Sequence, residues 1–186
     1  MKRIFDLIFG IIILIIFFIP ILLISLLIKL DTNGPIIYYS DRIGRYNKIF
    51  KMPKFRTMFI NSPQVASDKL LDPDKYLTKI GKLLRKFSLD EIPQIFNVIT
   101  GSMSIVGPRP ALYNQKTLIE KRTKLGIERL KPGITGLAQV SGRDKISLEE
   151  KISYDFEYLK KNSLFYDIKI IIRTIVDVCK GRDVSH

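Results

Sequence analysis

Histidine and cysteine are almost absent from this sequence of 186 residues. Its one histidine is His186, the last residue, and its one cysteine is Cys179. The scarcity of histidine argues against a Ser-His-Asp or Cys-His catalytic site and against a histidine-rich metal site. A lone cysteine forms no intramolecular disulfide, which agrees with a reducing cytoplasm.

A Walker phosphate-binding loop is also missing. That loop needs a glycine five residues before its Gly-Lys pair, and Tyr76 stands at this position before Gly81 and Lys82. The sequence has no internal repeat, low-complexity tract or linker, and its length suits one ordinary domain. Any chemistry is therefore left to acids, bases, hydroxyls and glycine-rich turns.

Charged residues are missing from Leu7 to Ile28, a run of 22 residues bounded by Lys2, Arg3 and Lys29. A run of this length predicts a membrane segment. A signal peptide would need a small-residue cleavage site after the run, and the first alanine of the sequence is Ala66. We therefore expect the segment to be retained.

The path of this segment through a membrane is left open by the sequence. A straight helix of its length would reach about 33 Å, close to a hydrocarbon core of about 30 Å. Pro20 lacks an N–H, leaves the carbonyl of Ile16 without its helical partner, and divides the run into arms of 13 and 9 residues. A kinked spanning helix and a helix that bends at Pro20 and leaves on the side it entered both fit.

The rest of the sequence is strongly basic. The formal net charge is +13, from 31 Lys and Arg and 18 Asp and Glu. Three basic residues and one acidic residue lie in the first 29 positions, which leaves 28 minus 17, a net charge of +11, beyond them. Basic flanks favour a cytoplasmic location, although a long domain can cross a membrane whatever its charge. We predict a membrane-inserted segment at residues 1–30 and a cytoplasmic domain at residues 31–186, packed on the membrane surface.

A β-hairpin is predicted after the apolar run. β-Branched and aromatic residues from Ile36 to Ile43 indicate the first strand, and Gly44 to Lys48 indicate the turn. Ile49 and Phe50 begin the return strand.

Helical periodicity begins after the hairpin. The stretch "YLTKIGKLLRK" places Leu77, Ile80 and Leu84 on one face of a helix. Ser147 and Glu150 have the spacing of a capping box, which predicts a helix that runs to about residue 161.

The last helix is predicted from an apolar stripe at i, i+4, i+7 and i+8. One interpretation directs this stripe toward the core. The other makes the segment a basic amphipathic helix that rests on anionic lipid headgroups beside the N-terminal segment. The stripe consists of Leu164, Ile168, Ile171, Ile172, Ile175, Val178 and Cys179.

Two adjacent carboxylates, Asp90 and Glu91, lie in the stretch "FSLDEIPQIFN". A structural explanation is available, because Ser88 and Glu91 have capping-box spacing, Asp90 suits the positive end of a helix and Pro93 falls in the first turn. A functional explanation makes one carboxylate a nucleophile and the other a ligand to a hard cation such as Mg²⁺. The neighbouring segments favour the functional explanation.

Cationic and glycine-rich segments bracket the two carboxylates. Each basic residue taken singly is typical of a solvated surface. Together they suit a diphosphate, because arginines fork onto phosphate oxygens and glycines let backbone N–H groups approach them. Mg²⁺ and a nucleotide diphosphate are therefore the expected partners. The basic residues are Lys54, Arg56, Arg85, Arg109 and Arg143.

Two other classes of protein fit part of this pattern. A membrane-tethered nucleic-acid binder would explain the charge, but the sequence has no RNP motif, zinc finger or recognition helix, so we expect no nucleic-acid partner. A noncatalytic protein bound to anionic lipid would explain the amphipathic helix. Such a protein would tolerate Asp90→Asn, whereas an enzyme that uses Asp90 would not.

Four motifs, "KFRTM", "SLDEIPQIFNV", "GSMSIVGPRP" and "PGITGLAQVSGR", follow the N-terminal segment in this order. With them the sequence resembles the bacterial sugar transferase family, the small monotopic phosphoglycosyl transferases that act on polyprenol phosphate. The resemblance covers the chain from the Pro20 segment to the last helix and is to the minimal catalytic form, without the extra N-terminal membrane helices of longer relatives. It implies transfer of a phospho-sugar from a UDP-sugar to undecaprenyl phosphate, with release of UMP, to begin O-antigen, capsule, exopolysaccharide or a protein glycan.

The resemblance also implies roles for particular residues. Asp90 is the implied nucleophile, which would carry a covalent phospho-sugar, and Glu91 would bind Mg²⁺ beside Asp90 or remove a proton from the lipid phosphate. Arg85 would contact phosphate or orient the two carboxylates. The full set of implied phosphate and nucleotide contacts is Lys54, Arg56, Arg85, Arg109, Arg143 and the backbone around Gly133, Thr135, Gly136 and Gly142.

The predicted fold is α+β and mainly helical. It has a small β-hairpin, a re-entrant N-terminal membrane helix that breaks at Pro20, and amphipathic helices on the membrane surface. Family members often carry serine before this proline, whereas this sequence has Ile19. The predicted location is the bacterial cytoplasmic (inner) membrane, with the catalytic domain on its cytoplasmic face. No motif reports which sugar is transferred.

Overall fold

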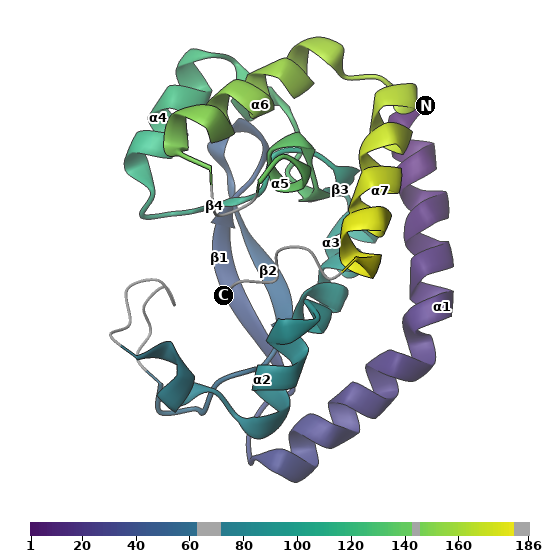
Figure 1. Ribbon diagram of the computed structural model, residues 1–186, viewed down its shortest axis with the longest axis vertical. Helices are drawn as coiled ribbons and strands as arrows, with labels where there is room; N and C mark the ends of the chain where they lie inside the picture. Colours follow the sequence, from purple (N-terminus) through teal and green to yellow (C-terminus); the bar gives the residue numbers. More distant parts are fainter. Residues whose placement is uncertain (63–71, 143–145, 181–186) are drawn as a thin grey trace.

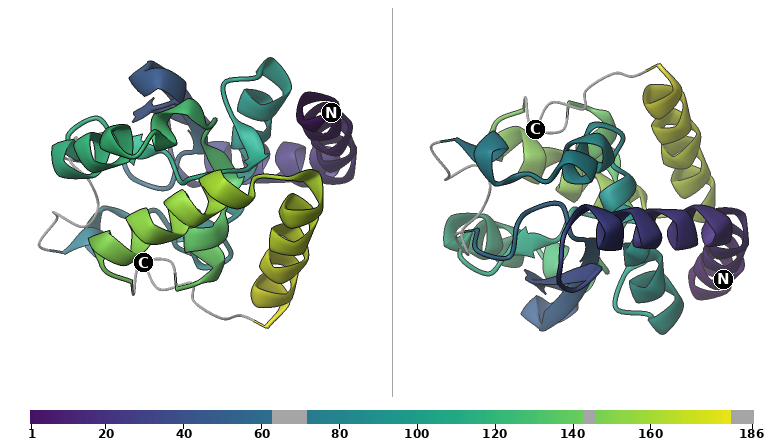
Figure 2. Two further views of the ribbon diagram at one scale, coloured as in Figure 1. Left: turned by 90° about the horizontal axis from the view of Figure 1, so that it is seen from above. Right: turned by 90° about the horizontal axis from the view of Figure 1, so that it is seen from below.

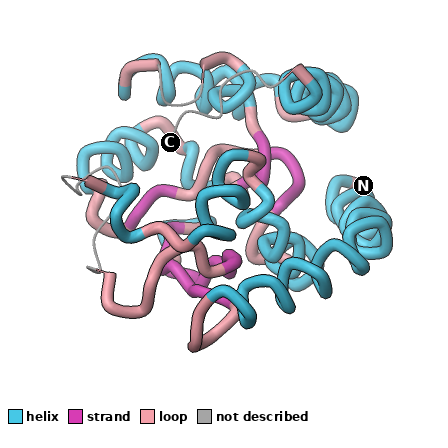
Figure 3. Tube along the Cα trace, turned by 60° about the horizontal axis from the view of Figure 1, so that its bottom comes forward, coloured by secondary structure: helices cyan, strands magenta, loops and turns pink. Residues whose placement is uncertain are grey.

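A computed structural model describes residues 1–62, 72–142 and 146–180 of the chain. In these residues the protein is a mainly helical α+β structure, as predicted, and its strands form two small sheets (Figures 1 and 3). The strands are β1 (Ile37–Ile43), β2 (Ile49–Phe55), β3 (Ser104–Val106), β4 (Ala111–Leu112) and β5 (Gly133–Thr135). The α-helices are α1 (Lys2–Asp31), α2 (Lys79–Lys86), α3 (Ile95–Thr100), α4 (Lys116–Lys124), α5 (Leu137–Val140), α6 (Leu148–Lys161) and α7 (Leu164–Cys179). Short 3₁₀ helices are η1 (Arg45–Asn47), η3 (Pro73–Tyr76), η4 (Leu89–Gln94) and η5 (Ile127–Arg129).

The predicted β-hairpin is confirmed, and its second strand continues to Phe55. β1 and β2 pair antiparallel, from Ile37 opposite Phe55 to Ile43 opposite Ile49. β4 pairs with the other edge of β1, so that the sheet order is β2-β1-β4. β3 and β5 form a separate parallel pair.

One predicted helix start is present, and the structure adds a cap at a second helix. The Ser147 hydroxyl accepts a hydrogen bond from Glu150 N (3.2 Å), and Glu150 Oε2 accepts one from Ser147 N (2.8 Å), which confirms the capping box of α6. Thr78 Oγ1 accepts from Gly81 N (2.9 Å) and caps α2. Of the predicted helical face, Leu77 lies before α2, whereas Ile80 and Leu84 lie in it and Leu84 is fully buried.

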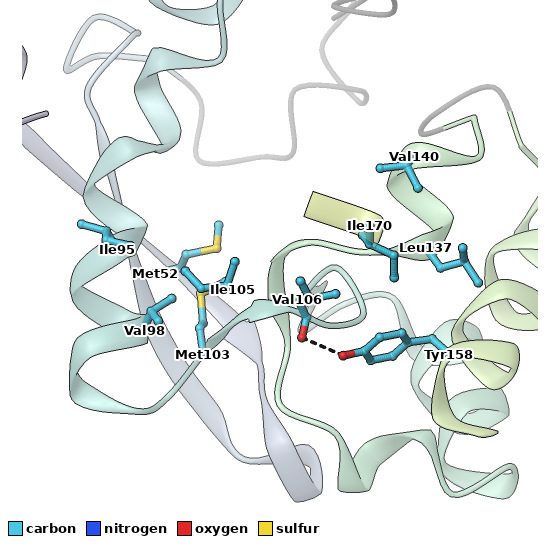
Figure 4. Packing of buried hydrophobic residues seen from close by; sticks show 10 residues of the cluster. All are labelled: Met52, Ile95, Val98, Met103, Ile105, Val106, Leu137, Val140, Tyr158 and Ile170. Carbon is cyan, nitrogen blue, oxygen red and sulfur yellow. Dashed lines mark hydrogen bonds between the residues drawn. The ribbon is translucent and has the colours of Figure 1, made fainter. Parts of the chain in front are cut away.

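The main hydrophobic core lies between the hairpin, α3, the β3–β5 pair and the two C-terminal helices (Figure 4). Tyr158 of α6 enters this core, and its hydroxyl donates to the carbonyl of Val106 (3.2 Å). The buried members are Met52, Ile95, Val98, Met103, Ile105, Val106, Leu137, Val140, Tyr158 and Ile170.

Helix α1 is long and apolar enough to cross a membrane by length and composition, and few of its side chains are buried. It continues as one helix through Pro20, and its axis bends partway along its length (Figure 1). Proline is a common cause of such bends, because it removes one helical hydrogen bond and crowds the preceding turn.

The N-terminal end of α1 is fastened to the rest of the protein by polar contacts. Arg3 donates to two carbonyls in the last turn of α3 (2.5 and 2.6 Å). The buried carboxylate of Asp6 accepts hydrogen bonds from the Ser104 hydroxyl (2.9 Å) and from the backbone N–H of Ile105 (3.0 Å). Lys2 forms an ion pair with Asp167, which is fully buried in α7.

The C-terminal end of α1 contacts the same body. Ile24 and Ile28 are buried against Phe55 of β2 and Leu84 of α2. The carboxylate of Asp31 accepts a hydrogen bond from the first turn of α2, at a distance of 3.1 Å. Both ends of the helix therefore pack on one globular unit, while much of the surface between them is exposed.

Helix α7 confirms the predicted span, but most of its stripe does not face the core. Ile170 and Asp167 are the buried residues, whereas Ile168, Ile172 and Ile175 are exposed. Helices α1 and α7 lie on the same side of the molecule in all views (Figures 1 and 2). The interpretation of α7 as an ordinary core-facing helix is therefore wrong for most of the stripe.

Candidate active site

The acidic dyad, Asp90 and Glu91, lies in the first turn of η4. The preceding Ser88 has a left-handed backbone (φ 53°, ψ 23°), and its side chain makes no capping hydrogen bond. The predicted capping box between Ser88 and Glu91 is therefore wrong. The reason is that cations from other elements take the Glu91 carboxylate instead.

Cations from two other segments converge on the dyad. Lys54, from β2, lies 2.8 Å from Glu91 Oε1 and 3.5 Å from Asp90 Oδ2. Arg109, in the loop between β3 and β4, places Nη2 at 3.1 Å from the same Glu91 oxygen. Asp90 is 5 % exposed. The hairpin and this loop thus join the dyad, so that four of the site residues predicted from motifs far apart in the sequence lie together.

Glu91 is strongly stabilised as an anion. Burial raises its pKa, but the charges of Arg109 and Lys54 and their hydrogen bonds outweigh burial and leave the pKa well below its usual range. A carboxylate with so low a pKa is a weak proton acceptor at neutral pH. The arrangement therefore favours a role for Glu91 in binding and orientation over the removal of a proton.

Arg85, at the end of α2, lies on the Asp90 side of the dyad. Its Nε donates to Thr57 Oγ1 (3.1 Å). Burial lowers the pKa of Arg85, while the nearby carboxylate of Asp90 raises it, with a net lowering. Arg85 is thus close enough to act on Asp90 electrostatically, as either of its predicted roles requires.

The loop that carries Arg109 is held by α4 and α6. Arg122 Nη1 donates to the carbonyl of Arg109 (2.9 Å), and Arg122 Nη2 lies 2.6 Å from the carboxylate of Asp155. Asp155 is 2 % exposed. This buried ion pair fixes the backbone of Arg109. The motif around Arg109 did not predict the ion pair, because Arg122 and Asp155 lie outside it, in α4 and α6.

Arg42 is a site residue that the sequence reasoning missed. It lies in β1, where it shares a face with Tyr38, and Tyr38 is opposite Lys54 across the hairpin. Burial first, and then the charge of Arg109, lower the pKa of Arg42 to about 10, while Glu91 raises it. The alternation of residues in the predicted hairpin could have placed Arg42 on the same face as Lys54.

Arg56 was predicted to contact phosphate, but in the structure it binds backbone carbonyls at the end of α1. It is 6 % exposed, and its terminal nitrogens donate to the carbonyls of Asn33 (2.6 Å) and Thr32 (2.9 Å) just after α1. These contacts hold the end of the apolar helix. The phosphate contact predicted for Arg56 stays a prediction that these contacts do not support.

The glycines of "PGITG" serve close packing of backbones. A Cβ atom on Gly133 would lie 2.1 Å from Gly107 N, and one on Gly136 would lie 2.1 Å from Gly107 O. The Thr135 hydroxyl pairs with that of Thr174 in α7 (2.7 Å). The structure thus gives these residues a packing role, and the predicted nucleotide cradle stays a prediction.

The remaining predicted cradle residues lie at the end of that motif. Gly142 has a positive φ of 147°, a conformation that favours glycine. Arg143 lies outside the described residues.

Comparison with known proteins places the chain in a family. The model of the family described as bacterial sugar transferase matches residues 1–181 of the chain. The chain belongs to the bacterial sugar transferase family. As a member of it, the protein is an enzyme of the sugar transferase class.

Relatives of this sugar transferase include short and long proteins. The chain is 37 % identical over 196 residues to the exopolysaccharide production protein ExoY of Rhizobium meliloti, covering 97 % of this chain and 86 % of that protein. It is 39 % identical over 186 residues to the uncharacterized sugar transferase EpsL of Bacillus subtilis, covering 100 % and 91 %. The UDP-N-acetylgalactosamine-undecaprenyl-phosphate N-acetylgalactosaminephosphotransferase of Aeromonas hydrophila is 37 % identical over 165 residues, which cover 84 % of this chain and 38 % of that longer protein.

The carboxylates of the site are the candidate ligands for the predicted magnesium ion. Among the described residues no group of three or more His, Cys, Asp or Glu side chains comes together. Mg²⁺ is commonly held by one or two carboxylates together with substrate phosphates and water. Asp90 and Glu91 therefore fit a magnesium ion that is shared with a phosphorylated substrate.

Proposed function

We propose that this sugar transferase moves a sugar-1-phosphate from a UDP-sugar to undecaprenyl phosphate and releases UMP, as the first step in making a bacterial polysaccharide or other glycoconjugate. One observation carries the proposal: the buried Asp90 stands beside Glu91 within a group of cations contributed by the hairpin, α2 and the β3–β4 loop. The printed name of the Aeromonas relative supplies the donor and acceptor classes.

The charge of the site suits a nucleotide diphosphate. Lys54, Arg85, Arg109 and Arg42 surround the two carboxylates of the dyad, so the described cations exceed the described anions. Guanidinium groups bind phosphate oxygens in a forked geometry. A bound diphosphate would offset the excess positive charge.

The proposed reaction has two displacement steps. A carboxylate oxygen of Asp90 forms a bond to the sugar-bearing phosphorus, the bond from that phosphorus to the bridging oxygen breaks, and UMP leaves with this oxygen. A phosphate oxygen of undecaprenyl phosphate then attacks the same phosphorus and releases Asp90. Because an ionised phosphate needs no general base, this route does not require Glu91 to take a proton.

Each cation has a place in this route. Lys54 holds Glu91 and approaches Asp90, so it orients both carboxylates, and Arg85 offsets charge on the Asp90 side. Asp90 and Glu91 would hold Mg²⁺, which when bound supplies positive charge to the phosphates. Arg109 stays on the Glu91 side, where α4 fixes its backbone.

The proposed location is the bacterial cytoplasmic membrane, with α1 inserted as a re-entrant helix. A spanning helix would separate its two ends by the bilayer, whereas the contacts of Arg3 and Asp6 at one end and Asp31 at the other attach both ends to one body. The exposed apolar residues of α1 and α7 on the same side of the molecule would lie in and on the lipid (Figure 2). The catalytic domain would then rest on the cytoplasmic face.

Cysteine labelling tests this topology. One variant has a cysteine inserted after Met1 and the other carries Asn33→Cys, both in a Cys179→Ser background, because residues 1 and 33 are exposed. A membrane-impermeant thiol reagent should label neither in intact cells and both after permeabilisation. Labelling of only one of the two in intact cells would show a helix that crosses.

The reaction is tested by omitting the acceptor. Purified enzyme, Mg²⁺ and a panel of UDP-sugars should give one competent donor that releases UMP in a burst no larger than the amount of enzyme. The peptide that contains Asp90 should gain the mass of a phospho-sugar and lose it when undecaprenyl phosphate is added. Asp90→Asn should abolish both, and a donor that turns over with acceptor yet gives no burst and no adduct without it would refute the covalent route.

A further inference from the structure

Arg42 has a position in the hairpin that directs it to the loop of Arg109. Its backbone pairs with Phe50 of β2 on one side and with Leu112 of β4 on the other. Since Arg109 precedes β4 by two residues, the pairing of β4 with β1 brings the two arginines to the same end of the sheet.

Among the described residues, the guanidinium of Arg42 is held by neutral groups only. Its Nε donates to the hydroxyl of Ser40 (3.1 Å), which is 8 % exposed, and its Nη1 reaches the carbonyl of Pro110 (3.4 Å), the residue after Arg109. Within the described part of the chain Arg42 forms no ion pair with a carboxylate, and its Nη2 makes no hydrogen bond. One donor edge of a half-buried cation is thus left for another partner.

Two like charges are held close together here. Burial disfavours the positive charge of Arg42, and the charge of Arg109 disfavours it further, yet a pKa of about 10 keeps Arg42 protonated at neutral pH. Glu91 is the carboxylate that offsets this repulsion, and it is already shared between Arg109 and Lys54. An anion between the two guanidiniums would relieve the repulsion and use the open donor edge.

The cations are also divided between the two ends of the dyad. Arg85 lies near Asp90. Arg109 forms an ion pair with Glu91, and Arg42 donates to the carbonyl of Pro110, the residue after Arg109. In the proposed reaction Asp90 attacks the sugar-bearing phosphate. The other phosphate of the donor, which leaves as UMP, then falls toward the Glu91 end.

We propose that Arg42 binds the phosphate of the leaving UMP, as the second guanidinium of a pair with Arg109. This inference rests on the proposed function, because it assumes a UDP-sugar donor attacked by Asp90. It makes Arg42 a substrate-binding residue supplied by the hairpin, outside the four motifs that carry the family resemblance. Ser40 acts as its positioning residue through the hydrogen bond to Nε.

The test compares Arg42→Gln with Arg45→Gln in the full-length enzyme. Arg45 lies in the turn of the same hairpin and donates to the carbonyl of Arg129 (2.7 Å), so it is a matched control for the loss of one hairpin arginine. In Arg42→Gln the constants for inhibition by UMP and the KM for the UDP-sugar should rise about tenfold or more, as expected for a lost charged hydrogen bond. Arg45→Gln should leave both unchanged, and Arg42→Lys should fall between, since it keeps the charge and loses the fork.

Two further readings separate binding from folding. In Arg42→Gln the KM for undecaprenyl phosphate should not change. The constant for inhibition by uridine, which has no phosphate and inhibits more weakly than UMP, should not change either. General damage to the hairpin would alter both. Unchanged UMP inhibition, or an equal loss for uridine, in an enzyme that still turns over would overturn this inference and leave the proposed function standing. If the wild-type enzyme neither binds UMP nor turns over any UDP-sugar, the proposed function fails and this inference fails with it.

Discussion

Substitution of Gly133 by alanine distinguishes a strand-packing role from a phosphate-binding role. The added Cβ would lie 2.1 Å from Gly107 N and 2.4 Å from Thr135 O, both backbone atoms that cannot rotate away. The strands must separate, which breaks the hydrogen bonds from Gly107 N to Thr135 O and from Gly133 N to Pro108 O, each 2.9 Å long. Leaving such buried groups unsatisfied costs about 1–3 kcal/mol each, or about 2–6 kcal/mol together.

That loss is large compared with the total free energy of unfolding of a domain, which is about 5–15 kcal/mol. In detergent, thermal unfolding followed by circular dichroism should show a Tm lowered by about 5–20 °C. Gly126→Ala is the matched control, because Gly126 has a φ of 76° but its nearest neighbouring atom lies 3.9 Å from the added Cβ. Strain alone should cost about 1 kcal/mol there and lower Tm by about 2–4 °C.

The opposite pattern would refute this reasoning. If Gly133→Ala melts with the Gly126→Ala control while its KM for the UDP-sugar rises tenfold, the glycine serves a phosphate and the strands tolerate a side chain. Circular dichroism and steady-state kinetics on the same preparation decide between the two.

Three further predictions concern other contacts of the structure. Because folding lowers the pKa of Glu91, the ionised carboxylate stabilises the protein above its unfolded pKa of about 4.3, and this contribution is lost as pH falls toward the folded pKa. Lys54→Gln should therefore weaken the dependence of Tm on acidic pH. A curve of Tm against pH that matches the wild type would contradict this prediction. Ser88→Val should destabilise the protein by about 1–2 kcal/mol more than Ser88→Gly, since the left-handed backbone at φ 53° disfavours a branched Cβ, and equal chemical unfolding midpoints would count against it. Asp6→Ala removes the acceptor of two buried donors and should cost about 2–6 kcal/mol, so a wild-type Tm in this variant would disprove the anchoring role of Asp6.

Local pattern was sufficient for much of the fold. The hairpin, the capping box at Ser147 and the span of α7 depend on side chains within a few residues of one another, and all three are present. The direction of the α7 stripe depends on what packs against the helix. Periodicity identifies an apolar face, but it does not say whether protein or lipid covers it.

The candidate site was predictable only in part, for the same reason. Asp90, Glu91 and Lys54 were found from motifs, whereas the contacts that decide their chemistry join residues far apart in the sequence. Arg56 looked like a phosphate ligand because of its motif, yet it binds the end of α1. The capping box predicted at Ser88 does not form, because the Glu91 carboxylate instead forms ion pairs with Lys54 of β2 and Arg109 of the β3–β4 loop. Charged contacts in a half-buried site are stronger than a cap hydrogen bond at a short 3₁₀ helix.

The attachment of both ends of α1 has a consequence for the order of events during synthesis. Lys2 leaves the ribosome before its partner Asp167, which is separated from it by 165 positions. At about 5–20 residues per second the chain needs about 10–30 s to cover that interval. During that interval Lys2 has no partner, whereas Arg3 and Asp6 can bind as soon as their partners at residues 98–105 have been made. A ribosome-bound chain truncated before α7 should therefore leave α1 docked through Arg3 and Asp6 with Lys2 unpaired, so the ion pair of Lys2 with Asp167 is the latest of these contacts to form.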